Sequence, residues 1–354
     1  MFADYYYEIY LSVLFCVLLY LVLNYDSSQI KARGSESLIP SFVLFIIISL
    51  FIGLRPHSGV FVDTLNYKMQ FENLKGVMLY VPKSDKLFRY FTYYSSQIMS
   101  VSEWFLIISI VYFGGMLYSC RRLVPKDTLF AFVVCLSAYS CFAYGTNGLR
   151  NGMATSIAML ALTYRDRKFI SVALLLLASG IHLSMLLIFV SSIISYIFKN
   201  TKIYIIVWIL CIFISIFVSG FFETLFAGFI EDDRTDYLTL EGDVYGGDGG
   251  FRWDFLLYSS MPILVGYYFV VLRKISDEKY KWILNTYIIS NTFWVLVMRA
   301  SFSNRFAYLS WFLYPIVLIY PFLKFHYVKN QYKKTSLFAF LHFCFTYFMM
   351  LIGK

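Results

Sequence analysis

The chain has 354 residues, of which 60% are hydrophobic and only 14% are charged. This small share of charged residues cannot cover a surface exposed to water. The composition therefore excludes a soluble globular protein and predicts an all-α, polytopic integral membrane protein. The formal net charge of +9 does not indicate a nucleic-acid partner, because the basic residues are spread over the connections between apolar segments.

Twelve apolar segments, two of them short, are candidate spans, so we expect about 11 to 12 transmembrane helices. No basic residue precedes the first segment and no small-residue cleavage site follows it, so we expect it to be retained. In chain order the candidates are 5–24, 38–54, 102–119, 128–145, 150–163, 169–181, 183–198, 203–219, 254–272, 282–298, 306–322 and 336–352.

The distribution of charge predicts the orientation of these segments. If Lys31 and Arg33 are cytoplasmic, the inner loops carry 18 of the 30 basic residues against 6 acids, and the outer segments carry 12 against 15 acids. This agrees with the excess of Lys and Arg found in cytoplasmic loops. We therefore expect the N-terminus and the two longest connections to lie outside the membrane.

Three segments stand out within this single transmembrane domain. The outer segment 55–103 contains an interfacial helix near Lys86 to Ser100, and the outer segment 220–253 is acidic and rich in glycine. Segment 169–198 is predicted to be a helical hairpin with its tip at His182, because a single span there would invert the charge pattern of all later loops. Its short arms place the tip in a water-filled recess.

Arg150 lies where one apolar segment ends and the next begins, in Gly145–Ala154. An arginine at that depth is costly unless it faces a cavity or a partner, so it marks a candidate functional site. The small residues around it predict a broken or tightly turned helix start, where free N–H groups favour an anion. The alternative is an arginine that reaches the interface from a helix end.

Past the first outer segment, the basic residues expected outside are arginines until the terminal Lys354. The guanidinium group stays charged and binds phosphate oxygens through two parallel hydrogen bonds, so arginines that converge would suit a phosphate or diphosphate. The alternative is ordinary pairing with the acidic outer segment or with carbonyl groups. These arginines are Arg150, Arg234, Arg252, Arg299 and Arg305.

His182 is the only one of four histidines between two apolar arms. It could donate to a phosphate or accept a proton near neutral pH, although a histidine there can also simply bridge two helices. Asp63 is a weaker candidate because acids are common in loops. Its neighbours Thr64, Asn66 and Tyr67 would suit sugar hydroxyl groups.

No residue pattern indicates a cofactor or a metal. The six cysteines lack metal-like spacing, and the acidic segment lacks the ligand order of an EF-hand. Nucleotide-binding and zinc-hydrolase motifs do not occur in the sequence.

Four ordered motifs resemble the signatures of EpsG-like, Wzy-type polysaccharide polymerases, and together they cover most of the chain. The first departs from the usual pattern, because Val60 to Val62 separate Gly59 from Asp63. The motifs are Gly59–Tyr67 with Phe71, Asn147–Ala154, Lys168–Ile170 with Leu177–Met185, and Asn304–Tyr308.

This resemblance implies that repeat units carried on undecaprenyl diphosphate are joined at the periplasmic face of the bacterial inner membrane, with no cofactor. The implied partners are lipid-linked glycan donor and acceptor, membrane lipid and a chain-length regulator protein. The diphosphate would lie among Arg150, Arg299 and Arg305, with His182 or Asp63 as base or orienting group. The other expected substrate contacts are Arg55, Asn66, Tyr67 and Asn147.

Three other functions stay open. An O-antigen ligase would transfer the glycan to lipid A core by the same chemistry. A flippase for the same lipid-linked glycan should show repeat symmetry and charges along a path through the membrane. A membrane acyltransferase is disfavoured because the sequence has no histidine–acid motif at a helix end.

Overall fold

The computed structural model describes residues 3–24, 38–218, 221–222, 225, 250–300, 303–325 and 331–352, and every regular element in these residues is a helix. The predicted all-helical fold class is confirmed. Among these residues, the helices long and apolar enough to cross a membrane are Ala3–Leu23, Val101–Leu123, Trp253–Leu272, Ser303–Lys324 and Gln331–Leu351. The chain is therefore a multi-pass membrane protein by helix length and hydropathy.

Length and hydropathy alone thus identify five spans, or six if one bent helix pair is a single span, against the 11 to 12 crossings expected. Several other expected segments form apolar helices of 10–17 residues, which fall short of a full hydrocarbon thickness. These shorter helices are α3 (Leu38–Gly53), α10 (Lys168–Ile181), α11 (Met185–Ile197) and α12 (Thr201–Phe217).

The chain forms two compact units, of which the first comprises Met1–Leu186 and Ile319–Lys354. Besides α3 and α10, the helices of the first unit are η1 (Ala3–Tyr5), α1 (Tyr6–Asn24), α4 (Thr64–Asn73), α5 (Lys86–Ile98), α6 (Val101–Leu123), α7 (Thr128–Leu136), α8 (Tyr139–Thr146), α9 (Leu149–Thr163) and α19 (Gln331–Ile352).

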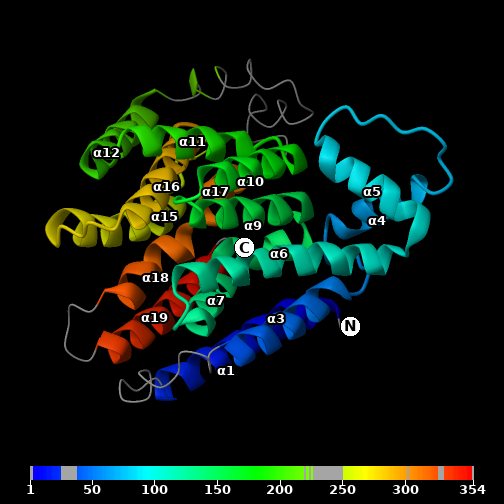
Figure 1. Cartoon of the computed structure of the whole chain (residues 1–354), viewed down its shortest axis with the longest axis horizontal. Coiled ribbons are helices and arrows are strands. Elements are labelled where there is room, and N and C mark those ends of the chain that lie inside the picture. Colours follow the sequence, from blue (N-terminus) through cyan, green and yellow to red (C-terminus); the bar gives the residue numbers. More distant parts are fainter. Residues whose placement is uncertain are drawn as a thin grey trace. The chain divides into compact units, whose positions relative to one another are not determined.

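Helix α6 organises the first unit. It packs against α3 and α9, and α9 also packs against α10, so these helices lie side by side, with α4 and α5 near one end of α6 (Figure 1). The start of α6 is fixed by a capping box. The Ser100 hydroxyl accepts a hydrogen bond from the Glu103 backbone N–H, and the Glu103 carboxylate accepts one from the Ser100 backbone N–H. This cap separates α5 from α6.

The expected span 128–145 is not straight, because α7 and α8 meet at an angle of 73°. Ala138 is extended at this break. The hydroxyl of Tyr10 in α1 donates to the Leu136 carbonyl at 2.6 Å, and that of Tyr112 in α6 donates to the Cys141 carbonyl at 3.3 Å. Neighbouring helices thus satisfy carbonyl groups on both sides of the bend, which makes it tolerable in an apolar environment.

The second unit, Leu187–Leu318, contains most of α11 and a fully paired polar network. The Trp208 indole donates to Asn291, whose amide group donates to Ser259 and Ser310 at 3.1 and 3.0 Å. Such satisfied groups stabilise helix packing where water is absent. The other helices are α12, α15 (Trp253–Gly266), the π-helical η3 (Tyr267–Leu272), α16 (Glu278–Leu296), α17 (Ser303–Trp311) and α18 (Tyr314–Lys324), which extends past Leu318.

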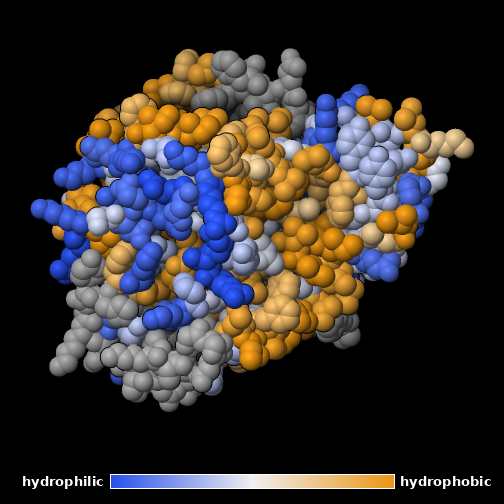
Figure 2. Space-filling view, in the orientation of Figure 1, coloured by the Kyte–Doolittle hydropathy of each residue, from blue (hydrophilic) through white to orange (hydrophobic). Residues whose placement is uncertain are grey.

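The surface differs from that of a water-soluble protein. Apolar residues cover much of the face in Figure 2, and large side chains such as Ile39 and Phe169 are 71% and 93% exposed. The part of the first unit formed by α4 and α5 has a mixed polar and apolar surface. A broad apolar surface is expected where lipid replaces water.

Replacing Gly152 by alanine is expected to destabilise the protein, because a Cβ there would lie 2.6 Å from the backbone carbonyl oxygen of Tyr144. Overpacking of this kind costs roughly 1–3 kcal/mol. The matched control is Gly114→Ala in α6, whose Cβ would lie 3.5 Å from Phe45. Thermal unfolding in detergent should show a lower transition temperature for the first variant only, and equal temperatures would contradict the close contact.

Candidate functional site

Arg150 is the second residue of α9, directly after a break in the helix. Helix α8 ends at Thr146, Asn147 is its C-cap, and Gly148 precedes α9. This confirms the broken helix start predicted around Arg150. The Arg150 side chain is 27% exposed and lines a pocket in the first unit.

The partner of Arg150 is Asp85, a residue that sequence analysis did not identify. Arg150 Nη1 donates to Asp85 Oδ2 at 2.7 Å. The same carboxylate accepts from the Leu183 backbone N–H at 3.0 Å and lies 3.3 Å from His182 Nδ1 through each of its oxygens. One buried carboxylate thus joins α5, α9 and the end of α10.

The backbone of Asp85 explains how the carboxylate reaches these partners. Asp85 precedes α5 with φ 46° and ψ 46°, and its side chain makes no capping hydrogen bond to that helix. The left-handed region is uncommon outside glycine, though aspartate tolerates it better than most residues. Strained backbone of this kind concentrates at functional sites. The carboxylate is directed to Arg150 and His182 instead of capping α5.

The loop before Asp85 is fixed to α5. The Tyr93 hydroxyl donates to the Val77 carbonyl at 2.9 Å, and Gln97 both donates to the Leu74 carbonyl at 2.7 Å and accepts from the Gly76 N–H at 3.1 Å. Gly76 has a φ of 72°, which glycine adopts without steric cost. These bonds hold residues 74–77 against α5.

Asp85 is charged at neutral pH. Burial alone would raise its pKa, but the hydrogen bond from His182 and the positive charges of His182 and Arg150, with the Leu183 N–H, lower the pKa below its ordinary value of 3.8. An ionised carboxylate only accepts hydrogen bonds, so the contact with Asp85 keeps a proton on His182 Nδ1.

His182 is 2% exposed and ends α10 in an extended conformation. The helix break falls at the predicted hairpin tip, since α11 begins at Met185. The hairpin itself stays a prediction, because its two arms belong mostly to different units. His182 does not line the pocket beside Arg150. Its Nδ1 lies beside the Asp85 carboxylate.

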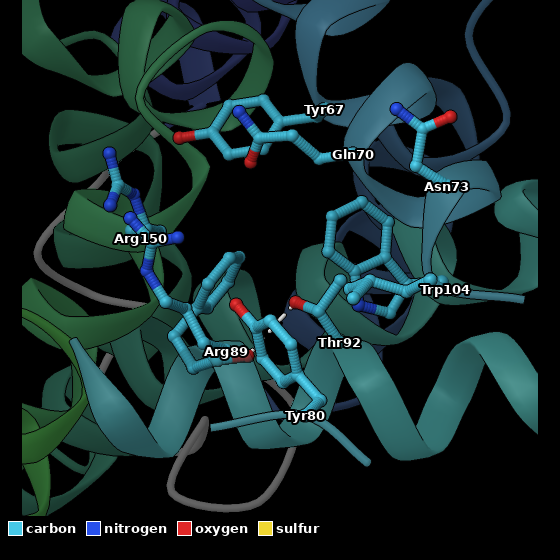
Figure 3. Close-up of a pocket in the computed structure, with 10 residues that line it drawn as sticks. Tyr67, Gln70, Asn73, Tyr80, Arg89, Thr92, Trp104 and Arg150 are labelled. Carbon is cyan, nitrogen blue, oxygen red and sulfur yellow. Dashed lines mark hydrogen bonds between the residues drawn. The ribbon is translucent and has the colours of Figure 1, made fainter. Parts of the chain in front are cut away.

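The pocket has a volume of about 200 Å³. Figure 3 shows Arg89 and Arg150 at one side and Trp104 and Asn73 at the opposite side, while Tyr67 and Gln70 close a third side. Arg89 Nε and Trp104 Nε1 are buried, and no described residue forms a hydrogen bond with either atom. The residues that line the pocket are Tyr67, Gln70, Asn73, Leu74, Tyr80, Phe88, Arg89, Thr92, Trp104 and Arg150.

Of the other site residues predicted in the first unit, some line the pocket and some do not. Tyr67 lines the pocket, whereas Asn66, Asp63 and Asn147 do not. Asn66 is exposed, and Asp63 precedes α4 without a capping hydrogen bond from its side chain. Asn147 has a buried side-chain oxygen with no partner. The roles expected for these three residues stay predictions.

Arg55 does not line the pocket, because it is 2% exposed and bound to other parts of the chain. Its Nη1 and Nη2 donate to the carbonyls of Ile52 and Thr146, both at 2.9 Å, while Nε donates to the Thr64 hydroxyl at 3.2 Å. Burial lowers the pKa of Arg55 to about 10. Arg55 thus joins the ends of α3 and α8 to the start of α4.

The remaining predicted arginines belong to the second unit or to residues that the structure does not describe. Arg299 follows α16, and its buried Nε has no partner in the described part of the chain, while Arg305 lies in α17. Arg252 is paired with Asp254 at 2.6 Å, which matches the ordinary ion-pair alternative. Arg234, Lys31, Arg33 and the acidic residues of segment 220–253 lie outside the described residues.

In the described part of the chain, no group of three or more His, Cys, Asp or Glu residues could hold a metal ion. Sequence analysis missed Asp85, Arg89 and Trp104, which complete the site. The available signal was their segment, since the helix from Lys86 was predicted and Asp85 immediately precedes it. Folding brings this segment beside Arg150, 65 residues later.

No curated protein and no solved structure matches the chain. The family model of the EpsG family matches residues 38–354, which include Asp85, Arg150 and His182. The matched region covers most of the chain and the whole of the pocket described above. The chain therefore belongs to the EpsG family of membrane proteins, which is implicated in exopolysaccharide biosynthesis.

Proposed function

We propose that this protein is a membrane-embedded glycosyltransferase that polymerises undecaprenyl-diphosphate-linked oligosaccharide repeat units at the periplasmic face of the inner membrane. The observation that carries the proposal is the Asp85 carboxylate holding Arg150 at the edge of a pocket that also contains Arg89. Asp85, Arg150 and Arg89 together carry a net charge of +1. A pocket of this charge suits an anionic ligand.

In the proposed reaction, the bond between the anomeric carbon of the donor glycan and the diphosphate oxygen breaks. An acceptor hydroxyl oxygen forms the new bond to that carbon and loses its proton to a base. Arg150 and Arg89 stabilise the negative charge that builds on the departing diphosphate. His182 or Asp63 is the candidate base or orienting group.

Reconstitution tests this function. The purified full-length protein is incubated with lipid-diphosphate-linked repeat units in liposomes, and the products are separated on a gel. A ladder of lengthening glycans is expected. Transfer to lipid A core instead of to another lipid-linked unit would indicate the O-antigen ligase. Movement of the glycan lipid between leaflets without bond formation would indicate the flippase.

His182 variants separate an orienting role from a base. His182→Ala is expected to lose most polymer formation. His182→Asn should retain activity within about tenfold of the wild type, because its amide N–H can replace Nδ1–H as a donor to Asp85, whereas loss of a general base costs about 10²–10⁴-fold. Initial rates of ladder formation measure this. If His182→Asn is as inactive as His182→Ala, histidine acts as the base.

The periplasmic orientation of the site gives a further prediction. Met78, on the loop before Asp85, is 98% exposed, so Met78→Cys should react with a membrane-impermeant maleimide in right-side-out vesicles. The background carries serine in place of the exposed Cys16 and Cys344. Lys126→Cys, between α6 and α7, is the control and should react only after permeabilisation. The reverse pattern would place the site in the cytoplasm.

A further inference from the structure

The pocket beside Arg150 is lined by aromatic and amide side chains that the binding of an anion alone would not require. Arginines account for one side, but the remaining walls are formed by aromatic rings and by the side-chain amides of Gln70 and Asn73 (Figure 3). Aromatic faces attract the C–H groups on one face of a sugar ring, and amides hydrogen-bond its hydroxyl groups. The aromatic lining residues are Tyr67, Tyr80, Phe88 and Trp104.

Trp104 supplies a second, independent observation. Its side chain is fully buried at the start of α6, and its ring centroid lies 5.2 Å from that of Phe71 and 5.9 Å from that of Phe88. Its indole N–H has no hydrogen-bond partner among the residues that the structure describes. An indole nitrogen can only donate, and a buried donor without a partner is unfavourable. Trp104 is 0% exposed, so a ligand hydroxyl oxygen would satisfy this donor after the side chains that cover the nitrogen shift on binding.

The size of the pocket limits the ligand. Its volume of about 200 Å³ is below the roughly 300–1,000 Å³ of pockets that enclose drug-sized ligands. It corresponds to about seven water molecules at about 30 Å³ each. A single six-membered sugar ring therefore suits the pocket, whereas an oligosaccharide repeat unit would have to extend beyond it.

We infer that this pocket is the subsite for one pyranose ring directly attached to phosphate. The ring lies among Tyr67, Phe88 and Trp104, and its phosphate lies on Arg89 and Arg150. This inference rests on the proposed function and adds that the enzyme recognises the first sugar of the lipid-linked donor. The rest of the glycan leaves the pocket on the side away from the arginines.

The experiment measures binding to the purified full-length protein in detergent by calorimetry. The probes are glucose 1-phosphate, N-acetylglucosamine 1-phosphate and inorganic phosphate. At least one sugar phosphate is expected to bind about tenfold more tightly than phosphate alone, because only the sugar reaches the Trp104 donor. Trp104→Phe keeps an aromatic ring and removes the donor, so it should weaken sugar phosphate binding about fivefold and leave phosphate binding unchanged.

Controls make the result decisive. Trp253→Phe, at a residue that is 62% exposed in the second unit, should change neither affinity. If Trp104→Phe does not fold, Gln70→Ala replaces it, since Gln70 is exposed and lines the same pocket. Equal affinities for phosphate and for both sugar phosphates, or equal weakening of all probes by the Trp104 or Gln70 variant, would overturn the subsite.

The result of the binding experiment can be distinguished from the result of the polymerisation assay. If sugar phosphates bind as expected but lipid-linked repeat units give no ladder, the polymerase proposal fails and the subsite stands. If a ladder forms but sugar phosphates bind no better than phosphate, the subsite fails and the polymerase proposal stands.

Discussion

Arg150→Lys is expected to abolish polymer formation, with a loss of at least about 10²-fold in rate. Lysine keeps the positive charge but cannot hold the Asp85 carboxylate with one nitrogen while presenting others to a diphosphate. Arg150 Nη1 is already bound to Asp85 at 2.7 Å, so the ligand depends on the remaining N–H groups of the same planar group. Ladder formation by the reconstituted variant measures the loss.

The matched control is Arg121→Lys, at an exposed residue in the last turn of α6. It should support normal ladders and should be present in the membrane in the same amount as Arg150→Lys. Long-chain polysaccharide from cells that carry only Arg150→Lys would contradict the role of the guanidinium group.

Asp85→Ala is expected to reduce both stability and activity strongly. It leaves Arg150, His182 Nδ1 and the Leu183 N–H without their shared acceptor. Removing one partner of a buried ion pair costs about 3–5 kcal/mol, and a misplaced Arg150 should lower the polymerisation rate as much as its own substitution does. Thermal unfolding in detergent and ladder formation are the two measurements.

The pH dependence of the unfolding temperature tests whether the charge of Asp85 is what stabilises the fold. The folded-state pKa of Asp85 lies below its ordinary value of 3.8, so its ionised form stabilises the fold fully above that value. This stabilisation is lost as the pH falls through the lower folded-state pKa. Wild type and Asp85→Asn should therefore differ in unfolding temperature at pH 5 to 8 and converge in stronger acid. At pH 7, Asp63→Asn, at a residue with no side-chain capping bond, should unfold at the wild-type temperature.

Local patterns in the sequence predicted much of the fold. The apolar segments, the break before Arg150 and the helix end at His182 follow from composition and small residues, and α5 appears at Lys86–Ile98 within the range expected. The bend between α7 and α8 was not predicted, because Ser137 and Ala138 carry no strong helix-breaking signal. The carbonyls at that bend are satisfied by Tyr10 and Tyr112 of distant helices.

The site was predicted in part for the same reason. Arg150 and His182 stood out because polar residues at the ends of apolar segments are costly, whereas Asp85 lies in a polar segment where an acid is unremarkable. Its importance comes from a left-handed backbone and from partners 65 and 97 residues away. Arg55 is a different case, since it joins three helix ends through buried hydrogen bonds, and the substrate contact expected of it stays a prediction.

The shared carboxylate of Asp85 has a consequence for turnover. Because Asp85 already neutralises Arg150, an entering diphosphate competes with a resident anion and is held less tightly than by two unopposed cations. In the proposed reaction a diphosphate carrier must depart after every addition. An internal competitor of this kind weakens product inhibition, so repeated cycles on a growing glycan are not stalled by the spent carrier.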